Sequence, residues 1–186
     1  TVLPFNYNNF IELEELIQNN DIGVIKMEVQ RNEPPKDGFL EKVRKIATKN
    51  NIILIFDECT SGFRETFGGL HKKYGVDPDM AVFGKALGNG YGITGVIGKR
   101  GVMEAAQSTF ISSTFWTERI GPVAGLKTLE VMEKEQSWNQ ITEVGKQIGK
   151  RWKTLAKKYE LPIEINGLPA LINFNMPVEN WLKYKT

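Results

Sequence analysis

Short apolar runs alternate with segments of helical periodicity along the first half of the chain. Two segments have apolar residues at helical spacing: Phe10–Gln18, which Asn9 can cap, and Phe39–Lys49. The apolar runs predict strands over residues 22–29, 51–56, 80–83 and 93–98. The run 51–56 is continuously apolar, which is typical of strands in parallel sheets. Strands that alternate with helices predict an α/β fold.

The pattern changes after Gly101. Helical spacing predicts one helix from near Thr117 to Glu135 and another that begins at Ser137. Two short strands are expected beyond them, in the "PIEI" and "ALINF" segments. We therefore expect two parts, residues 1–136 and residues 137–186.

Composition and charge exclude several classes of function. Of the 186 residues, 41% are hydrophobic and 25% are charged, as in ordinary globular proteins. The net charge of +2 gives no electrostatic argument for a nucleic acid or a membrane as partner. Cys59 is the single cysteine, so an internal disulfide is excluded. The first residues lack a signal peptide, and we expect a cytoplasmic protein.

A glycine-rich stretch, "FGKALGNGYGITG", follows the strand predicted at 80–83. Its Gly90, Gly92 and Gly95 match the dinucleotide fingerprint G-x-G-x-x-G. That fingerprint needs a strand before it and a helix that opens within it, and here a strand-like segment follows instead. The spacing therefore gives only weak support to a nicotinamide or flavin site.

The run "IILIFDE" permits a second interpretation. A hydrophobic strand that ends in Asp57 and Glu58 resembles the magnesium-binding strand of P-loop ATPases. The phosphate loop of that class, G-x-x-x-x-G-K-[ST], has no match, because Arg100 stands where "VIGKR" should have Ser or Thr. A P-loop ATPase stays open as an alternative.

A third interpretation joins the two motifs. Asp57 ends one predicted strand, and Lys85 follows the next, 28 residues later. In a parallel sheet both lie at the carboxyl edge, where open α/β sheets bind ligands. A lysine and a carboxylate there suit pyridoxal phosphate: the amine forms an imine, and the carboxylate holds a proton on the pyridine nitrogen. Arginine could not be the nucleophile, since it does not lose its proton.

The segment "IILIFDECTSGFRETFGGLHKKYGVDPDMAVFGKALGNGYGITGVIGKR" resembles the class III aminotransferases, most closely the glutamate-1-semialdehyde 2,1-aminomutase branch. Its most specific parts are "DE" followed by "GFR", "YGV-x-PD" and "GKALG-x-G". The resemblance implies a fold type I enzyme dependent on pyridoxal 5'-phosphate, here the second half of the large domain with a mostly parallel sheet plus the start of a small α+β domain. It also implies transfer of an amino group, as a transaminase or an aminomutase, on a small amino or carbonyl substrate.

The resemblance also assigns residues. Lys85 matches the Schiff-base lysine and Asp57 the partner of the pyridine nitrogen. Cys59 stands where the family usually has a valine packed on the ring. Thr114 matches the threonine that reaches the cofactor phosphate of the neighbouring subunit in a homodimer. Thr117 is the alternative candidate for this threonine.

The family's phosphate cup corresponds to sequence before residue 1, so we expect this chain to be a fragment that is inactive by itself. A catalytically inactive dimerisation fragment is therefore a further alternative. Among the remaining polar residues, we expect Glu58 to be a structural hydrogen-bond partner. We expect His71 to be an exposed helix residue without a metal-binding role. Arg64 could bind a substrate carboxylate or form a salt bridge.

Overall fold

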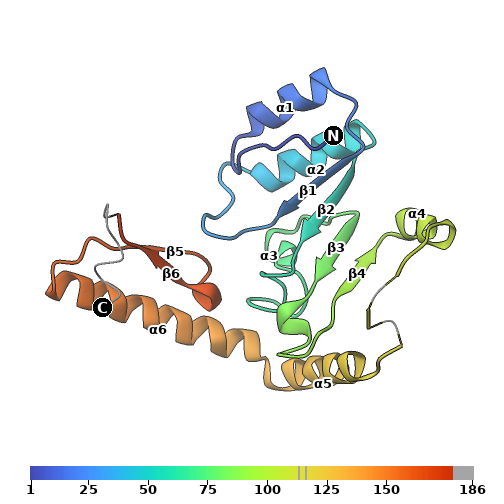
Figure 1. Cartoon of the computed structure of the whole chain (residues 1–186). Helices are drawn as coiled ribbons and strands as arrows, with labels where there is room; N and C mark the ends of the chain where they lie inside the picture. Colours follow the sequence, from blue (N-terminus) through green and yellow to red (C-terminus); the bar gives the residue numbers. More distant parts are fainter. Residues whose placement is uncertain (113, 116, 178–186) are drawn as a thin grey trace.

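The computed structural model describes residues 1–112, 114–115 and 117–177. Its centre is a sheet in the order β1-β2-β3-β4, with β1–β3 parallel and β4 antiparallel to β3 (Figure 1). The strands are β1 (Val24–Glu28), β2 (Ile53–Asp57), β3 (Met80–Phe83) and β4 (Gly95–Gly98). The predicted strands are all present, and the mostly parallel sheet is confirmed.

Two helices cover one face of this sheet (Figure 1). They are α1 (Phe10–Asn19) and α2 (Phe39–Lys49). The Asn9 side chain accepts a hydrogen bond from the backbone N–H of Glu12 at 3.3 Å, which confirms the predicted cap of α1. Alternate strand residues meet the helices in one apolar core, which includes Ile25, Met27, Leu54, Phe56, Phe39, Leu40 and Val43.

The other residues of each strand lie on the opposite, less covered face. The burial pattern alternates along β1 and β2, because successive side chains of a strand point to opposite faces. Register places Glu28 beside Asp57, and Asp57 beside Val82. Lys26 and Asp57 therefore share this open face, on which Val24 is 52% exposed.

The second half is helical before it returns to a small sheet. The main elements are α5 (Ile120–Glu135), α6 (Ser137–Lys158), β5 (Glu164–Asn166) and β6 (Asn173–Asn175), with β5 antiparallel to β6. Gln136, with a left-handed φ of 48°, separates the two helices. None of the helices in the described part of the chain is long and apolar enough to cross a membrane.

The two halves are joined by specific contacts. The backbone N–H of Gly167 donates to the carbonyl of Asn32 at 3.0 Å, and Leu168 is buried in the core of the first half. Within the second half, Gly145 of α6 lies so close to the carbonyl of Pro169 that a Cβ would stand 1.8 Å from its oxygen. The proposed division at residue 136 stays a prediction.

Short helical turns complete the chain. They are α3 (His71–Tyr74), α4 (Arg100–Met103) and the 3-10 turns η1 (Lys85–Leu87), η2 (Glu104–Ser108) and η3 (Pro169–Leu171). A helical conformation was expected at His71, whereas residues 169–171 overlap the start of the strand expected in "ALINF". Helix α5 begins at Ile120, three residues later than predicted. Of these turns, η1 is the one that shapes the candidate site.

Candidate functional site

Lys85 emerges directly from the carboxyl end of β3. Gly84 carries the chain past Cys59 so closely that a Cβ at Gly84 would stand 2.8 Å from the Cys59 Sγ. Lys85 itself has a φ of 41°, in the left-handed region that residues other than glycine rarely adopt. Backbone strain of this kind persists where surrounding contacts fix it, and it is concentrated at functional sites.

The Lys85 amine is held by neutral partners. Its Nζ donates to Thr60 Oγ1 at 2.8 Å and lies 3.8 Å from Cys59 Sγ. Among the described residues no carboxylate forms an ion pair with it. The amine is therefore not held as half of an ion pair, and a lysine in a site of this kind can serve as a nucleophile toward a carbonyl group.

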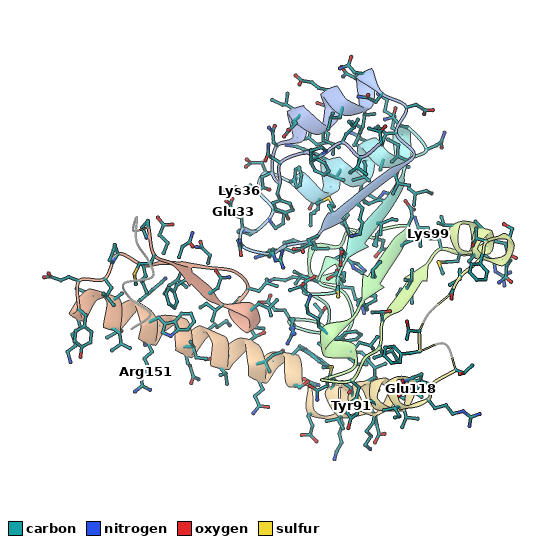
Figure 2. All side chains as sticks on the ribbon, in the orientation of Figure 1. Glu33, Lys36, Tyr91, Lys99, Glu118 and Arg151 are labelled. Atoms are coloured by element: carbon teal, nitrogen blue, oxygen red, sulfur yellow. The ribbon has the colours of Figure 1, made fainter. Side chains whose placement is uncertain are left out.

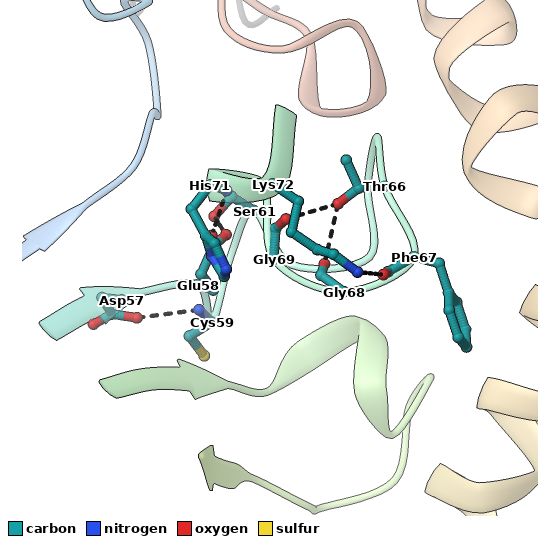
Figure 3. A network of polar contacts seen from close by, with 10 residues as sticks. All are labelled: Asp57, Glu58, Cys59, Ser61, Thr66, Phe67, Gly68, Gly69, His71 and Lys72. Carbon is teal, nitrogen blue, oxygen red and sulfur yellow. Dashed lines mark hydrogen bonds and ion pairs between the residues drawn. The ribbon is translucent and has the colours of Figure 1, made fainter. Parts of the chain in front are cut away.

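Asp57 lies at the end of the neighbouring strand. Its Oδ1 accepts a hydrogen bond from the backbone N–H of Cys59 at 3.1 Å (Figure 3), and its Oδ2 accepts one from Lys26 Nζ at 2.8 Å. Burial raises the pKa of Asp57, but the hydrogen bonds and the charges of Lys26 and Lys85 together hold this pKa below its usual value. The side chain is therefore a carboxylate at neutral pH.

Asp57 and Lys85 thus lie at the same edge of the sheet, as their strand ends predict. Cys59 joins them, because it donates to Asp57 through its backbone and contacts the Lys85 amine through its sulfur. This arrangement fits pyridoxal phosphate, which needs a free amine for its aldehyde and a carboxylate for its ring nitrogen. A carboxylate offers about four acceptor positions, so Asp57 can accept a further hydrogen bond.

Glu58 lies beneath the site in a network of buried hydrogen bonds (Figure 3). Its Oε1 accepts from the backbone N–H of His71 and contacts His71 Nδ1, both at 2.9 Å, and its Oε2 accepts from Ser61 Oγ at 2.5 Å. The structural role expected for Glu58 is confirmed. The expectation of an exposed His71 was wrong, since the residue is 9% exposed. The backbone N–H and the ring of His71 both contact the fully buried Glu58 carboxylate, and these contacts hold His71 inside the protein.

Arg64 lies beside the Lys85 turn. Both line a cavity of about 720 Å³, together with Tyr91, Lys127 and Met132. Arg64 Nε donates to the carbonyl of Thr60 at 3.4 Å, and no carboxylate in the described part of the chain forms a salt bridge with Arg64. Its binding of a substrate carboxylate stays a prediction.

The structure does not bring Thr114 to the other site residues. Thr114 and Thr117 are both exposed, in the connection between η2 and α5. Ser113 lies outside the described residues. No hydrogen bond between described residues joins either threonine to Asp57 or Lys85. A role for Thr114 would therefore need a partner subunit, as the family resemblance implies.

Sequence reasoning missed two residues that contact the proposed catalytic pair. Thr60 holds the Lys85 amine, and Lys26 holds the Asp57 carboxylate. The signal for Lys26 was present, because a charged residue interrupts the apolar run "IGVIKMEV". Thr60 had no comparable signal, since a threonine in a polar loop is common.

Comparison with known proteins decides the family. The family model described as "Aminotransferase class-III" matches residues 12–183. The chain belongs to the class III aminotransferase family. This membership confirms the resemblance on which the sequence interpretation rested. It also leaves the P-loop ATPase alternative without support.

Relatives of this class III chain include an aminotransferase and an aminomutase. It is 35% identical to the 3-aminobutyryl-CoA aminotransferase of Cloacimonas acidaminovorans over 90% of this chain and 43% of that protein. It is 33% identical to the glutamate-1-semialdehyde 2,1-aminomutase of Natranaerobius thermophilus over 89% of this chain and 41% of that protein. The chain therefore spans less than half the length of these relatives.

Solved structures confirm the fold of the class III chain. The FumI protein of Sphingopyxis sp. MTA144, solved in its PLP internal aldimine form, matches with a TM-score of 0.87 over 95% of this chain and 44% of that chain, at 18% identity. An omega-transaminase from Sphaerobacter thermophilus matches with a TM-score of 0.82 over 91% of this chain and 41% of that one, at 23% identity. The predicted fold type I architecture is confirmed.

Proposed function

We propose that the complete protein transfers an amino group on small amino or carbonyl substrates with pyridoxal 5'-phosphate as its cofactor. The observation that carries this proposal is the meeting of a lysine amine and an ionised carboxylate around Cys59 at one sheet edge. Family membership and the relatives' names support it. The pyridoxal ring, when bound, supplies an electron sink for charge that develops on the substrate.

Each residue has a separate role in this proposal. Lys85 binds the cofactor covalently through Nζ and, once released, accepts and returns a proton at that amine. Thr60 orients the amine through its hydroxyl. Asp57 holds the proton on the ring nitrogen, and Cys59 packs against the ring.

The proposal covers both a transaminase and an aminomutase. An aminomutase returns the nitrogen to a different carbon of the same molecule, whereas a transaminase passes it to a second substrate. A transfer assay with ¹⁵N-labelled amino donor distinguishes them, because label appears in an added keto acid only in a transaminase. We further propose a cytoplasmic homodimer in which Thr114 contacts the phosphate bound by the partner subunit.

Reductive trapping tests the assignment of Lys85. The complete protein incubated with pyridoxal phosphate and reduced with borohydride should gain one cofactor mass on the peptide that contains residue 85. Lys85→Ala should abolish this adduct and the visible absorbance of the bound cofactor. Lys72→Ala, which removes an exposed lysine whose amine donates to the carbonyl of Phe67, is the matched control and should leave both unchanged. Trapping at the original level in Lys85→Ala would refute the assignment.

A further inference from the structure

We propose that Lys26 is a positioning residue that fixes the Asp57 carboxylate and weakens its hold on a proton at the pyridine nitrogen. This inference rests on the proposed function, because it takes the pyridine nitrogen as the group that Asp57 binds. Lys26 is not part of the motifs that carry the family resemblance. It lies on a different strand from both Asp57 and Lys85.

The ion pair is a direct consequence of strand register. Lys26 pairs with Ile55, and Glu28 pairs with Asp57. Lys26 therefore lies on the same face of the sheet as Asp57, opposite the residue two positions before it. A long lysine side chain spans that diagonal, and Lys26 Nζ lies 2.8 Å from Asp57 Oδ2. The other oxygen, Oδ1, accepts from the N–H of Cys59 at 3.1 Å. Each carboxylate oxygen therefore has a fixed donor, which sets the direction of the side chain.

The remaining charges near Asp57 do not cancel the effect of Lys26. Glu28, its neighbour on β1, is 3.6 Å from Arg31 in an ion pair of its own. Lys85 contributes a charge from η1, and Cys59 contributes a thiol. Lys26 is the one cation bonded to Asp57 among the residues described. The hydrogen bond to Asp57 is the main reason that the pKa of Lys26 is raised, so Lys26 stays charged.

A permanent cation bonded to a carboxylate changes how strongly that carboxylate stabilises a second positive charge. Asp57 stabilises a protonated ring nitrogen by its negative charge, and Lys26 opposes this by its positive charge. Two unit charges separated by about two hydrogen-bond lengths interact in water strongly enough to move a pKa by about half a unit. Lys26 should therefore make the ring nitrogen release its proton at lower pH than Asp57 by itself would.

The ring-nitrogen experiment uses the complete protein loaded with pyridoxal phosphate that carries ¹⁵N in its ring. Its ¹⁵N chemical shift reports protonation of the nitrogen as the pH is raised. Lys26→Met should raise the midpoint of deprotonation by about half a pH unit or more, and Lys26→Arg should restore the original midpoint. An unchanged midpoint in Lys26→Met, or a nitrogen that stays protonated over the same pH range in both proteins, overturns the inference.

Lys36→Met is the matched control. Lys36 forms a comparable ion pair, 2.7 Å from Glu33, in the loop after β1 (Figure 2). Its side chain is 58% exposed, against 59% for Lys26. The two lysines therefore differ mainly in which carboxylate they hold. Lys36→Met should leave the midpoint of the ring nitrogen unchanged.

A second measurement needs no cofactor. In the unloaded protein, ¹³C labelling of aspartate carboxyl groups reports the titration of Asp57, identified by its loss in Asp57→Asn. Lys26→Met should raise the midpoint of Asp57, and an unchanged midpoint also overturns the inference. If the protein binds no cofactor at Lys85, the proposed function fails, whereas the titration of Asp57 still tests whether Lys26 acts on it.

Discussion

Asp79 holds together three elements at the end of the sheet remote from Lys85. Its Oδ2 accepts from Arg44 of α2 at 2.7 Å and from the backbone N–H of Leu54 in β2 at 2.8 Å. Its Oδ1 accepts from Lys99, directly after β4, at 2.8 Å. The side chain of Asp79 is 11% exposed, so solvent screens its contacts with Arg44 and Leu54 little, whereas the contact with the exposed Lys99 is screened more. Asp79→Asn keeps the shape of the side chain and removes its charge.

The cost of this substitution follows from the pKa of Asp79. Burial raises this pKa, but the hydrogen bonds from Leu54, Lys99 and Arg44 lower it more, from 3.8 to about 2. A lowered carboxylate pKa stabilises the folded state in full above the unfolded value. The contribution is then lost as the pH falls through the folded value. At neutral pH the shift corresponds to about 2–3 kcal/mol of unfolding free energy, and at pH 3 to about half of that.

Urea unfolding of the complete protein without cofactor measures this prediction. The difference in unfolding free energy between the wild type and Asp79→Asn should be about 2–3 kcal/mol at pH 7 and about half as large at pH 3. Hydrogen exchange should also speed up at the Leu54 amide, because a neutral side-chain amide is a weaker partner for this N–H than a carboxylate. Asp77→Asn, at an exposed position two residues earlier, should change neither. A difference below about 0.5 kcal/mol, or one that does not vary with pH, would refute the reasoning.

Two further predictions concern Glu58 and Thr114. Glu58→Gln leaves buried donors of His71 and Ser61 without their carboxylate, so thermal unfolding should show a loss on the order of 3 kcal/mol. Glu130→Gln, in an exposed ion pair, is its control and should cost less than about 0.5 kcal/mol. Thr114→Ala should weaken pyridoxal phosphate binding about 10- to 100-fold with little change in stability, because a hydroxyl–phosphate hydrogen bond is lost. A larger loss of affinity in Thr117→Ala, or a fully active monomer in sedimentation, would contradict the assignment of Thr114.

The sequence pattern was sufficient for the regular elements, because burial imposes their periodicity directly. The strand predicted at 80–83 coincides with β3, and the strand predicted at 51–56 begins two residues before β2 and ends one residue before its last residue. The pattern could not predict the short helical turns, because these turns depend on single contacts and not on a periodic spacing of apolar residues. The turn η1 begins at a lysine with positive φ, a conformation that the sequence "GKAL" does not suggest. The antiparallel pairing of β4 with β3 was also outside what periodicity can indicate.

The site was predictable only as far as strand ends determine it. Asp57 and Lys85 follow the last apolar residues of neighbouring parallel strands, so topology brings them to one edge. Lys26 contacts Asp57 across strands, and such a pair requires the register of β1 against β2. His71, in the segment "GGLHKKYGV", was predicted to be an exposed helix residue. A four-residue helix turns it inward to Glu58, which no local pattern reveals.

The adjacent acids Asp57 and Glu58 have different surroundings: Asp57 faces the candidate site, and Glu58 forms buried structural hydrogen bonds. Glu58 continues the ladder of β2, since its backbone N–H donates to the carbonyl of Val82 at 2.8 Å. Successive residues of a strand point to opposite faces, so one carboxylate must face the open side and the other the core. Asp57 meets Lys26 on the open face, whereas Glu58 is fully buried against His71 and Ser61. Under the proposed function, exchanging the surroundings of the two side chains would remove the carboxylate partner of the ring nitrogen and would bury a charge without its hydrogen bonds.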